Sequence, residues 1–505
     1  MSTPIDHYPR LRRALEILPG ACLWFTFVLV IVLSFIKPVW AACFIICYAL
    51  YWLFKSMTIS AYLIYAYKRM RRDTKINWLK KCENLGKRKG NSWEDIYHLI
   101  IFPTYKEELD VIESSFRALV NSNYPKDKII VVLGIEERDK ERGQANAQAI
   151  REKFENKFFM FKSYMHPDNI PGELKGKGAN ATWSARQIKK EIDHLNIPYE
   201  NIIVSNFDID TCVHPEYFGC LAYTYLTSKN PLRSSYQPIP LYHNNIWASP
   251  ALMRVVASSN SFWHMVEVAR PERLRTFSSH SMPWQTLVDV GFWDTHVVSE
   301  DSRIFWQCFL RYNGNYRVTP IFVPVSMDTV LAKSYFRSMV NQYKQMRRWA
   351  YGVEHIPYAL GNFIINYRKI PLWKKFIQGI RLFEGHYSWA VGIVIISFLG
   401  WLIFLFSDFS GFSQTVAAQT FLPITRIILT IALIGLIIIN VISTLILPKR
   451  PRRYSRFRYV GMIVQWVLQP VAGIFFGAVP AIDAQTRFML GKYMGFWVTE
   501  KARKY

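Results

Sequence analysis

Long runs of uncharged apolar residues stand near both ends of the chain. A helix needs about 20 predominantly apolar residues to cross a bilayer. Four runs reach that length without a charged side chain, and a fifth is interrupted only by Lys55. One run of this kind could be a helix buried in a soluble protein, but the repetition predicts an integral membrane protein. The runs are Ile17–Ile36, Pro38–Tyr67, Gly385–Ser407, Ile427–Leu447 and Tyr459–Ile482.

The stretch between the second and third runs has a different pattern, in which short β-rich segments alternate with helix-like segments. The pairs are 97–102 with 107–119, 129–133 with 144–154, and 202–205 with 215–226. Such alternation predicts an α/β fold with a mostly parallel sheet covered by helices. Ligands in that architecture bind beyond the carboxyl ends of the strands. Those ends carry Pro103-Thr104-Tyr105, Glu136-Glu137 and Asp208-Ile209-Asp210.

Charge gives the predicted spans an orientation. The net charge of the 505 residues is +25, and the basic residues crowd beside the apolar runs. Positive flanks mark the cytoplasmic side of a membrane, and anionic lipid attracts them. We therefore expect membrane lipids, and no nucleic acid, as partners of the basic surface. The seven cysteines show no metal-type spacing, and we expect reduced thiols.

The predicted organisation has four parts in a cell (plasma or inner) membrane. Residues 1–68 hold two transmembrane helices, 69–330 form a cytosolic α/β domain, 331–376 form amphipathic interfacial helices, and 377–505 hold about three spans and a basic tail. A single crossing by the last run would put that tail outside, against the charge rule. Pro470 lies within the run, so a broken or re-entrant helix is an alternative.

Two carboxylates separated by one residue, Asp208 and Asp210, follow an apolar strand. Such a pair can hold a hard cation such as Mg²⁺ or Mn²⁺ and leave sites for phosphate oxygens and water. In a group transfer the cation would neutralise charge on a diphosphate leaving group. The alternative is an Asx-type turn that caps the helix expected near Pro215, because aspartate favours such positions.

A second acidic pair, Glu300-Asp301, precedes the helix-like stretch 304–311. A carboxylate here could take the proton of an acceptor hydroxyl if it lies within hydrogen-bond reach. The alternative is a helix N-terminus, where acidic residues interact favourably with the helix dipole.

Gln345, Arg348 and Trp349 fall on one face of a helix, at spacings of three and four residues. A guanidinium can grip a diphosphate through two hydrogen bonds, and an indole is a flat platform for a sugar ring. The surrounding segment, 335–358, is also aromatic and basic, as an interfacial helix would be. Both interpretations stay open.

Together these segments resemble the membrane-integrated family 2 glycosyltransferases, the group that includes cellulose and hyaluronan synthases. The resemblance covers roughly residues 97–352 and the arrangement of the spans. It rests on several motifs in the family's order. These are Phe102-Pro103-Thr104-Tyr105-Lys106-Glu107, Gly176-Lys177-Gly178-Ala179-Asn180, Asp208 with Asp210, Glu300-Asp301, and Gln345 with Arg348 and Trp349.

The resemblance implies a GT-A-like, Rossmann-like cytosolic domain and an inverting, single-displacement sugar transfer. It makes Asp301, in the pair with Glu300, the general base. It also implies contacts for the donor, the metal ion and the acceptor. The nucleotide-sugar contacts are Thr104, Tyr105, Glu107, Glu136, Lys177, Asn180 and Asp208; Mg²⁺ or Mn²⁺ is held by Asp208 and Asp210; the diphosphate or acceptor contacts are Gln345, Arg348, Trp349 and His280.

The chain departs from the family at two places. Where two aspartates usually follow the second strand, this chain has Glu136-Glu137, and which of them contacts the nucleotide stays open. Where a Gly-rich acceptor loop is common, this chain has 277–284, which contains His280. A structural histidine of the loop is an equal alternative there.

We therefore expect a glycosyltransferase that uses a nucleotide sugar, UDP-linked by the family's habit, and a polysaccharide or lipid acceptor at the cytosolic membrane face. A processive synthase and an enzyme that adds one sugar to a lipid both fit the motifs. A non-catalytic transporter or scaffold would carry charged or discontinuous residues at the midplane of several spans. The spans carry few such residues.

Overall fold

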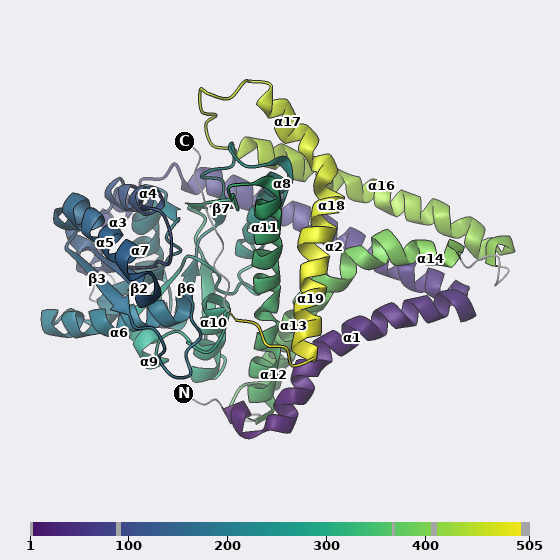
Figure 1. Cartoon of the computed structure of the whole chain (residues 1–505), viewed down its shortest axis with the longest axis horizontal. Helices are drawn as coiled ribbons and strands as arrows, with labels where there is room; N and C mark the ends of the chain where they lie inside the picture. The colour runs from purple at the N-terminus through teal and green to yellow at the C-terminus, as the bar shows by residue number, and fades with distance from the viewer. Residues whose placement is uncertain (1–3, 87–91, 366–368, 406–411, 496–505) are drawn as a thin grey trace. The chain divides into compact units, whose positions relative to one another are not determined.

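The chain forms two compact units in the computed structural model, which describes residues 4–86, 92–365, 369–405 and 412–495. The first, the helical unit, comprises Met1–Ile64 and Gln342–Met494. The second, the sheet unit, comprises Tyr65–Asn341 and Gly495–Tyr505. Figure 1 labels helices of both units and some of the strands of the second.

Five helices of the described chain are long and apolar enough to cross a membrane, as the apolar runs predicted. Many of their large apolar side chains, such as Trp40 and Phe54, are exposed on the helix surface. The end of the expected third span (406–407) and most of the basic tail (496–505) lie outside the described residues. The helices of this unit are α1 (Pro9–Ile36), α2 (Pro38–Asp73, which continues into the sheet unit), α12 (His355–Ile365), α13 (Leu372–Val394), α14 (Gly400–Leu405), α16 (Val416–Leu445), α17 (Arg458–Val464), α18 (Gln469–Gly473) and α19 (Val479–Met489).

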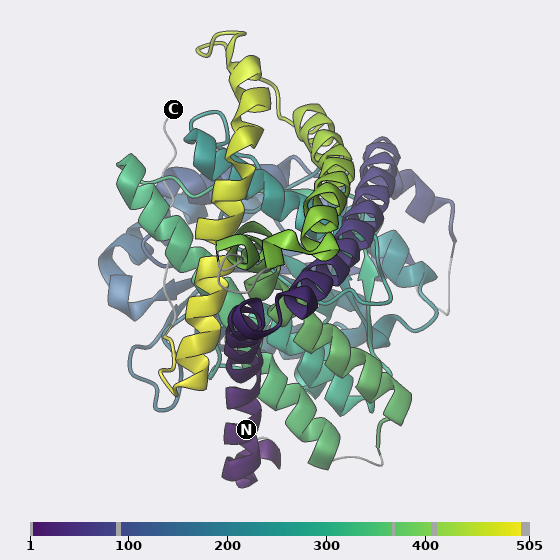
Figure 2. The same cartoon turned by 90° about the vertical axis from the view of Figure 1, so that its right-hand side faces the viewer.

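The last candidate span runs continuously over Arg458–Met489, and its helix is irregular around Pro470, where the sequence left a single crossing and a broken or re-entrant helix open. A 3₁₀ turn, Gln465–Leu468, precedes the proline, and a π-turn, Ile474–Ala478, follows it. Proline lacks an amide N–H and clashes with the preceding turn, so the α-helix cannot pass through it unchanged. In Figure 2 the lower end of this yellow helix lies beside the purple α1, where Arg13 donates hydrogen bonds to the carbonyl oxygens of Phe488 and Met489.

The sheet unit is built on a mixed sheet of seven strands in the order β3-β2-β1-β4-β8-β6-β9. The predicted strands are the parallel set β2-β1-β4, and β8 runs antiparallel to both β4 and β6. The strands are β1 (Tyr97–Pro103), β2 (Ile129–Glu136), β3 (Met160–His166), β4 (Ile202–Asn206), β6 (Ser234–Gln237), β8 (His280–Pro283) and β9 (Arg317–Pro320). A second sheet holds β5 (Cys212–Val213), β10 (Val325–Met327) and β7 (Pro240–Tyr242).

Helices cover the sheet because its central strands are apolar on both sides. Every residue of β2 is buried, and α4, α5 and α7 contribute to one continuous core with β1 and β2. Helix α6 also packs on the sheet, against strands β1, β2 and β3, and α10 packs against α6. The helices of this unit are α3 (Trp78–Glu83), α4 (Leu109–Val120), α5 (Lys140–Phe154), α6 (Lys177–Leu195), α7 (Tyr217–Thr227), α8 (Ala251–Val268), α9 (Trp284–Asp289), α10 (Glu300–Arg311) and α11 (Tyr335–Ala350, which continues into the helical unit).

The predicted α/β architecture is therefore confirmed, and all seven cysteines are free thiols, as expected. Since β2, β1 and β4 are parallel neighbours, their carboxyl ends share one edge of the sheet. The functional candidates at these three ends must lie along that edge.

Candidate active site

Three separate segments meet at the carboxyl edge of the sheet. Asp208 follows β4, Lys177 is the first residue of α6, and Glu300 is the first residue of α10. The Lys177 ammonium lies 2.6 Å from the Asp208 carboxylate and 3.9 Å from that of Glu300. Lys177 and Asp208, 31 positions apart, are thus brought together with Glu300, which follows Asp208 by 92 positions.

The glycine after Lys177, Gly178, allows the starts of α6 and α10 to approach closely. A Cβ added to Gly178 would lie 2.9 Å from the Cβ of Glu300 and 3.2 Å from the Asp294 carbonyl oxygen. The first turns of α6 and α10 therefore touch backbone to side chain, with no room for a methyl group. This close approach brings the starts of α6 and α10, and with them Lys177 and Glu300, next to each other.

Both predicted metal-binding carboxylates already accept hydrogen bonds from the protein. The Ser278 hydroxyl donates to Asp208 Oδ2 at 2.6 Å, while the Lys177 ammonium lies against Oδ1. The fully buried Asp210 accepts the backbone N–H of Asp328 at 2.8 Å. The following helix, α7, has Glu216 at its N-cap, so the capping alternative for the two aspartates does not hold.

Oxygen ligands of this kind suit Mg²⁺ or Mn²⁺, but two carboxylates do not complete a coordination shell. Within the described residues no group of three or more histidine, cysteine, aspartate or glutamate side chains converges to hold a metal ion. Asp208 and Asp210 therefore fit a divalent cation only if other ligands, such as diphosphate oxygens and water, arrive with it.

The pKa values of two groups in the cluster, Lys177 and Glu300, are raised. Burial opposes a charge on Lys177, but Asp208, Glu300 and Asp301 outweigh burial and raise its pKa, so it is an ammonium. Burial, and then the charge of Asp301, raise the pKa of Glu300 to about 8 against the attraction of Lys177. Near neutral pH Glu300 is mostly a neutral acid, and its side chain is only 3% exposed.

Asp301 differs from its neighbour in being half-buried rather than enclosed. Both acids stand in the first turn of α10, where the helix dipole favours negative charge. The pair therefore does stand at a helix N-terminus, as the structural alternative proposed. Asp301 is nevertheless partly exposed.

The other candidate donor contacts lie at the ends of β1 and β2 and are tied to the backbone there. The Thr104 hydroxyl donates to the Gly134 carbonyl oxygen, and the Glu107 carboxylate accepts the N–H of Tyr105. The amide of Asn180, 1% exposed, donates to the same Gly134 carbonyl oxygen at 3.1 Å. In the structure Asn180 joins α6 to these strand ends, and its predicted contact with the donor stays a prediction.

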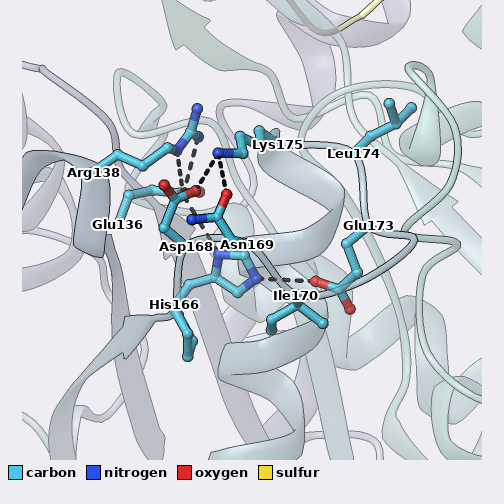
Figure 3. Close-up of a pocket in the computed structure, with 10 residues that line it drawn as sticks. Glu136, Arg138, His166, Asp168, Asn169, Ile170, Glu173, Leu174 and Lys175 are labelled. Carbon is cyan, nitrogen blue, oxygen red and sulfur yellow. Dashed lines mark hydrogen bonds and ion pairs between the residues drawn. The ribbon is translucent and has the colours of Figure 1, made fainter.

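A small pocket opens beside Glu136, at the ends of β2 and β3 (Figure 3). Glu136 accepts hydrogen bonds from Arg138 at 3.0 Å and lies 3.4 Å from His166 Nδ1. His166 Nε2 lies 3.1 Å from Glu173 on the loop before α6. Burial opposes protonation of His166, but its hydrogen bonds with the two glutamates outweigh burial and raise its pKa.

Of the two glutamates that the sequence left open, Glu136 lines this pocket. The Glu137 carboxylate instead accepts the backbone N–H of Asp168 at 2.7 Å. The Arg138 guanidinium also lies over the ring of Tyr105, 4.4 Å from its centroid. These contacts join the end of β1 to the pocket through Arg138.

His280 lies inside the fold on β8 and is fully buried. Its Nδ1 is 3.0 Å from the Phe277 carbonyl oxygen, and its Nε2 accepts the indole N–H of Trp293. Burial lowers its pKa to about 3, so the ring is neutral. These contacts fit the structural alternative, and a contact with acceptor or phosphate stays a prediction.

Gln345, Arg348 and Trp349 lie on α11, within the helical unit, so the helix expected for them is present. Gln345 is buried and accepts a hydrogen bond from Gln342, whereas Arg348 and Trp349 are half-buried. The same helix is tied to α19 through Asp483, which accepts hydrogen bonds from Tyr343 at 2.9 Å, Arg347 at 2.8 Å and Arg487 at 2.6 Å.

Residues 203–446 match the model of a protein family described as glycosyl transferase family group 2. The matched range covers just under half of the chain. The match supports a family 2 glycosyltransferase that depends on a nucleotide sugar, with a GT-A-like mixed α/β domain in the middle of the sequence and apolar helices toward both ends.

Solved structures resemble this glycosyltransferase only distantly. The mannosyltransferase PcManGT from Pyrobaculum calidifontis, in complex with GDP-Man and Mn²⁺, is 13% identical, covers 75% of this chain and 99% of its own, and has a TM-score of 0.40. S. aureus TarS 1–349 is 14% identical, covers 79% of this chain and 93% of its own, and has a TM-score of 0.35. Its complex with UDP-GlcNAc is 15% identical with the same coverage and a TM-score of 0.36. No curated protein matches the sequence significantly.

Two contributors to the glycosyltransferase's site had no clear signal in the sequence. Ser278 lay in a segment that departs from the family, and Asp328 acts through a backbone N–H that any residue type carries. His166 was missed because its strand, β3, was not predicted. The single basic residue among three acidic ones in 136–139 was a hint of the Arg138 contact.

Proposed function

We propose that the chain is an inverting glycosyltransferase that moves a sugar from a nucleotide-sugar donor, UDP-linked, to a polysaccharide or lipid acceptor at the cytosolic membrane face. One observation carries the proposal. Lys177, Asp208 and the pair Glu300-Asp301 converge at the carboxyl edge of the parallel strands, where ligands of α/β sheets bind.

In this mechanism an acceptor hydroxyl oxygen attacks the anomeric carbon of the donor sugar. Asp301 takes the hydroxyl proton, and the bond to the diphosphate breaks on the opposite side of the carbon, which inverts its configuration. Glu300 supports this assignment indirectly, because a buried acid with a pKa near 8 is a poor proton acceptor at pH 7. A positioned base contributes roughly 10²- to 10⁴-fold to a rate.

The departing diphosphate gains negative charge, and this chain holds cationic groups that suit it. Lys177 lies in the cluster as an ammonium, and Arg348 presents a guanidinium on α11. A divalent cation, when bound to Asp208 and Asp210, would neutralise further charge on the leaving group. The residues proposed to hold the nucleotide are Thr104, Tyr105, Glu107, Glu136 and Asn180. The residues proposed to contact the diphosphate or the acceptor are Gln345, Arg348, Trp349 and His280.

Donor identity is tested by screening the purified full chain in detergent against UDP- and GDP-linked sugars with Mg²⁺ or Mn²⁺. Released nucleoside diphosphate is measured, first alone and then with membrane lipid extract added. A folded sample that releases nothing from any donor would count against the proposed transfer. Product length then distinguishes the two acceptor classes, since a synthase gives long chains and a single-addition enzyme gives one sugar per lipid.

The base is tested by Asp301→Asn, with Asp289→Asn as the matched control. Asp289 is an exposed aspartate at the end of α9. We expect the Asp301 variant to lose roughly 10²- to 10⁴-fold in turnover and to bind nucleotide as the wild type does. Wild-type turnover in that variant would show that the base is another residue.

A further inference from the structure

The Asp208 carboxylate is occupied by protein groups on both of its oxygens. Lys177 lies 2.6 Å from Oδ1, and Ser278 donates a hydrogen bond to Oδ2 at 2.6 Å. The Lys177 side chain is 13% exposed and that of Asp208 is 27% exposed, so the ion pair is largely shielded from water. A shielded pair is more strongly coupled than a surface pair, because less solvent screens the two charges.

The ammonium of Lys177 is in an unfavourable position unless a nearby acid neutralises its charge. Lys177 is the first residue of α6, and a cation at a helix N-terminus opposes the helix dipole. The starts of α6 and α10 lie so close at Gly178 and Glu300 that no Cβ fits between them. Asp208 therefore stabilises Lys177 as much as Lys177 stabilises Asp208.

Ligands for a metal ion are correspondingly few. Asp210 Oδ2 accepts the N–H of Asp328, and within the described residues no third acidic, histidine or cysteine side chain completes a set. Mg²⁺ and Mn²⁺ prefer to keep several oxygen ligands. A free ion would compete with the lysine for the Asp208 carboxylate and would find few further acidic, histidine or cysteine ligands within the described residues.

We propose that Lys177 is the resident cation of the Asp208 carboxylate in the donor-free protein, and that a divalent metal ion enters only together with a nucleoside diphosphate. The inference rests on the proposed function. The diphosphate supplies two things at once, namely oxygen ligands for the metal ion and a new anionic partner for the lysine. The ammonium then moves from the carboxylate to phosphate, to which lysine binds as a point charge.

This arrangement makes metal ion and nucleotide bind with positive coupling, and the coupling must be the same in both directions. In the proposed exchange, the ammonium and the metal ion are alternative partners of the Asp208 carboxylate. Without diphosphate, the Lys177–Asp208 ion pair persists.

The first experiment uses the full chain in detergent micelles. Binding of Mn²⁺ is followed by the loss of the electron paramagnetic resonance signal of free Mn²⁺, without nucleotide and with UDP or GDP. Association of Mn²⁺ with the nucleotide in buffer is measured separately and subtracted. We expect nucleotide to tighten Mn²⁺ binding by at least about tenfold, the effect of one charged hydrogen bond gained. Equal Mn²⁺ affinity with and without nucleotide would overturn the inference.

The second experiment replaces the resident cation. Lys177→Met should bind Mn²⁺ without nucleotide roughly ten- to a hundredfold more tightly than the wild type, since no ammonium competes for Asp208. It should bind metal-free UDP more weakly, because the lysine no longer contacts phosphate. The matched control is Lys189→Met, which removes a lysine of the same helix that pairs with Asp193 at the surface. The control should change neither affinity.

The outcomes separate this inference from the proposed function. Binding of nucleotide with no change of free Mn²⁺ affinity in Lys177→Met would overturn the inference and leave the transferase intact. Failure of the wild type to bind any nucleotide, with or without Mn²⁺, would overturn both. The wild-type titration decides the inference even if the methionine variant does not fold.

Discussion

The buried acid Glu300 should make the folded protein sensitive to pH in a way that one substitution removes. Its side chain is 3% exposed, and burial raises its pKa from an ordinary 4.5 to about 8. Between these two values the folded protein keeps a proton on Glu300 that the unfolded chain has released. Glutamine has nearly the same shape and no proton to lose, so Glu300→Gln isolates this effect.

The direction of the pH dependence of stability follows from the number of protons that each state binds. In the window between about 4.5 and 8 the folded state binds more protons than the unfolded state, so stability falls as pH rises. Each pH unit in the window changes the folding equilibrium constant by up to about tenfold. The stability of Glu300→Gln relative to the wild type should therefore increase steadily from pH 5 to pH 8 and then level off.

The assay is thermal unfolding of the detergent-solubilised full chain, followed by tryptophan fluorescence at half-unit steps from pH 5 to pH 9. Glu141→Gln, an exposed glutamate on α5, is the matched control and should run parallel to the wild type. Parallel curves for Glu300→Gln and wild type across the whole range would refute the reasoning, because they would mean that Glu300 is ionised in the folded state.

Three further predictions concern packing and charge. Gly178→Ala should cut sugar transfer by roughly 10²-fold, since the new methyl group displaces the start of α10, whereas Gly385→Ala, with nothing within 4 Å of its added Cβ, should not. Glu384→Gln should destabilise the solubilised protein by about 1–3 kcal/mol, because it leaves the Lys55 ammonium, 2.5 Å away, without its carboxylate. A double variant with Lys55→Met should recover part of that loss in thermal unfolding. Additive losses would contradict the coupling between the two side chains. Asp483→Asn should speed amide hydrogen exchange in α11 by about tenfold, because its bonds to that helix weaken; unchanged exchange would contradict the role of Asp483.

Sequence reasoning worked where one strong local pattern decided the structure. The apolar runs predicted the spans, and β1, β2 and β4 were visible because their residues are apolar on both faces. β3 was missed because it is the edge strand of the sheet, where residues such as Lys162 and Ser163 interrupt the apolar pattern. α6 was missed because its buried face is made of small residues such as Ala181 and Ala185, which give a weak signal of helical periodicity.

In the candidate site too, some residues could be chosen from the sequence and others could not. Residue types with an obvious chemistry, such as Asp208 and Glu300, could be chosen from the sequence. Their partners could not, because Ser278 reaches Asp208 across 70 positions and only the antiparallel strand β8 brings its loop there. Burial, which decides the protonation of Glu300, is likewise a property of the packed fold and has no local signature.

The two neighbouring acids of α10 show how the fold can divide chemical roles between similar side chains. Environments that separate the pKa values of adjacent acids also separate their functions. Glu300 is enclosed and holds a proton at pH 7, so it can donate a hydrogen bond within the cluster but is a poor base. Asp301, half-buried one residue later, has the more accessible carboxylate. At pH 7, therefore, Glu300→Gln should reduce turnover far less than Asp301→Asn, although both changes replace one carboxylate by an amide. Comparable losses from the two variants would mean that the charge of the pair, rather than a proton acceptor at Asp301, supports the transfer.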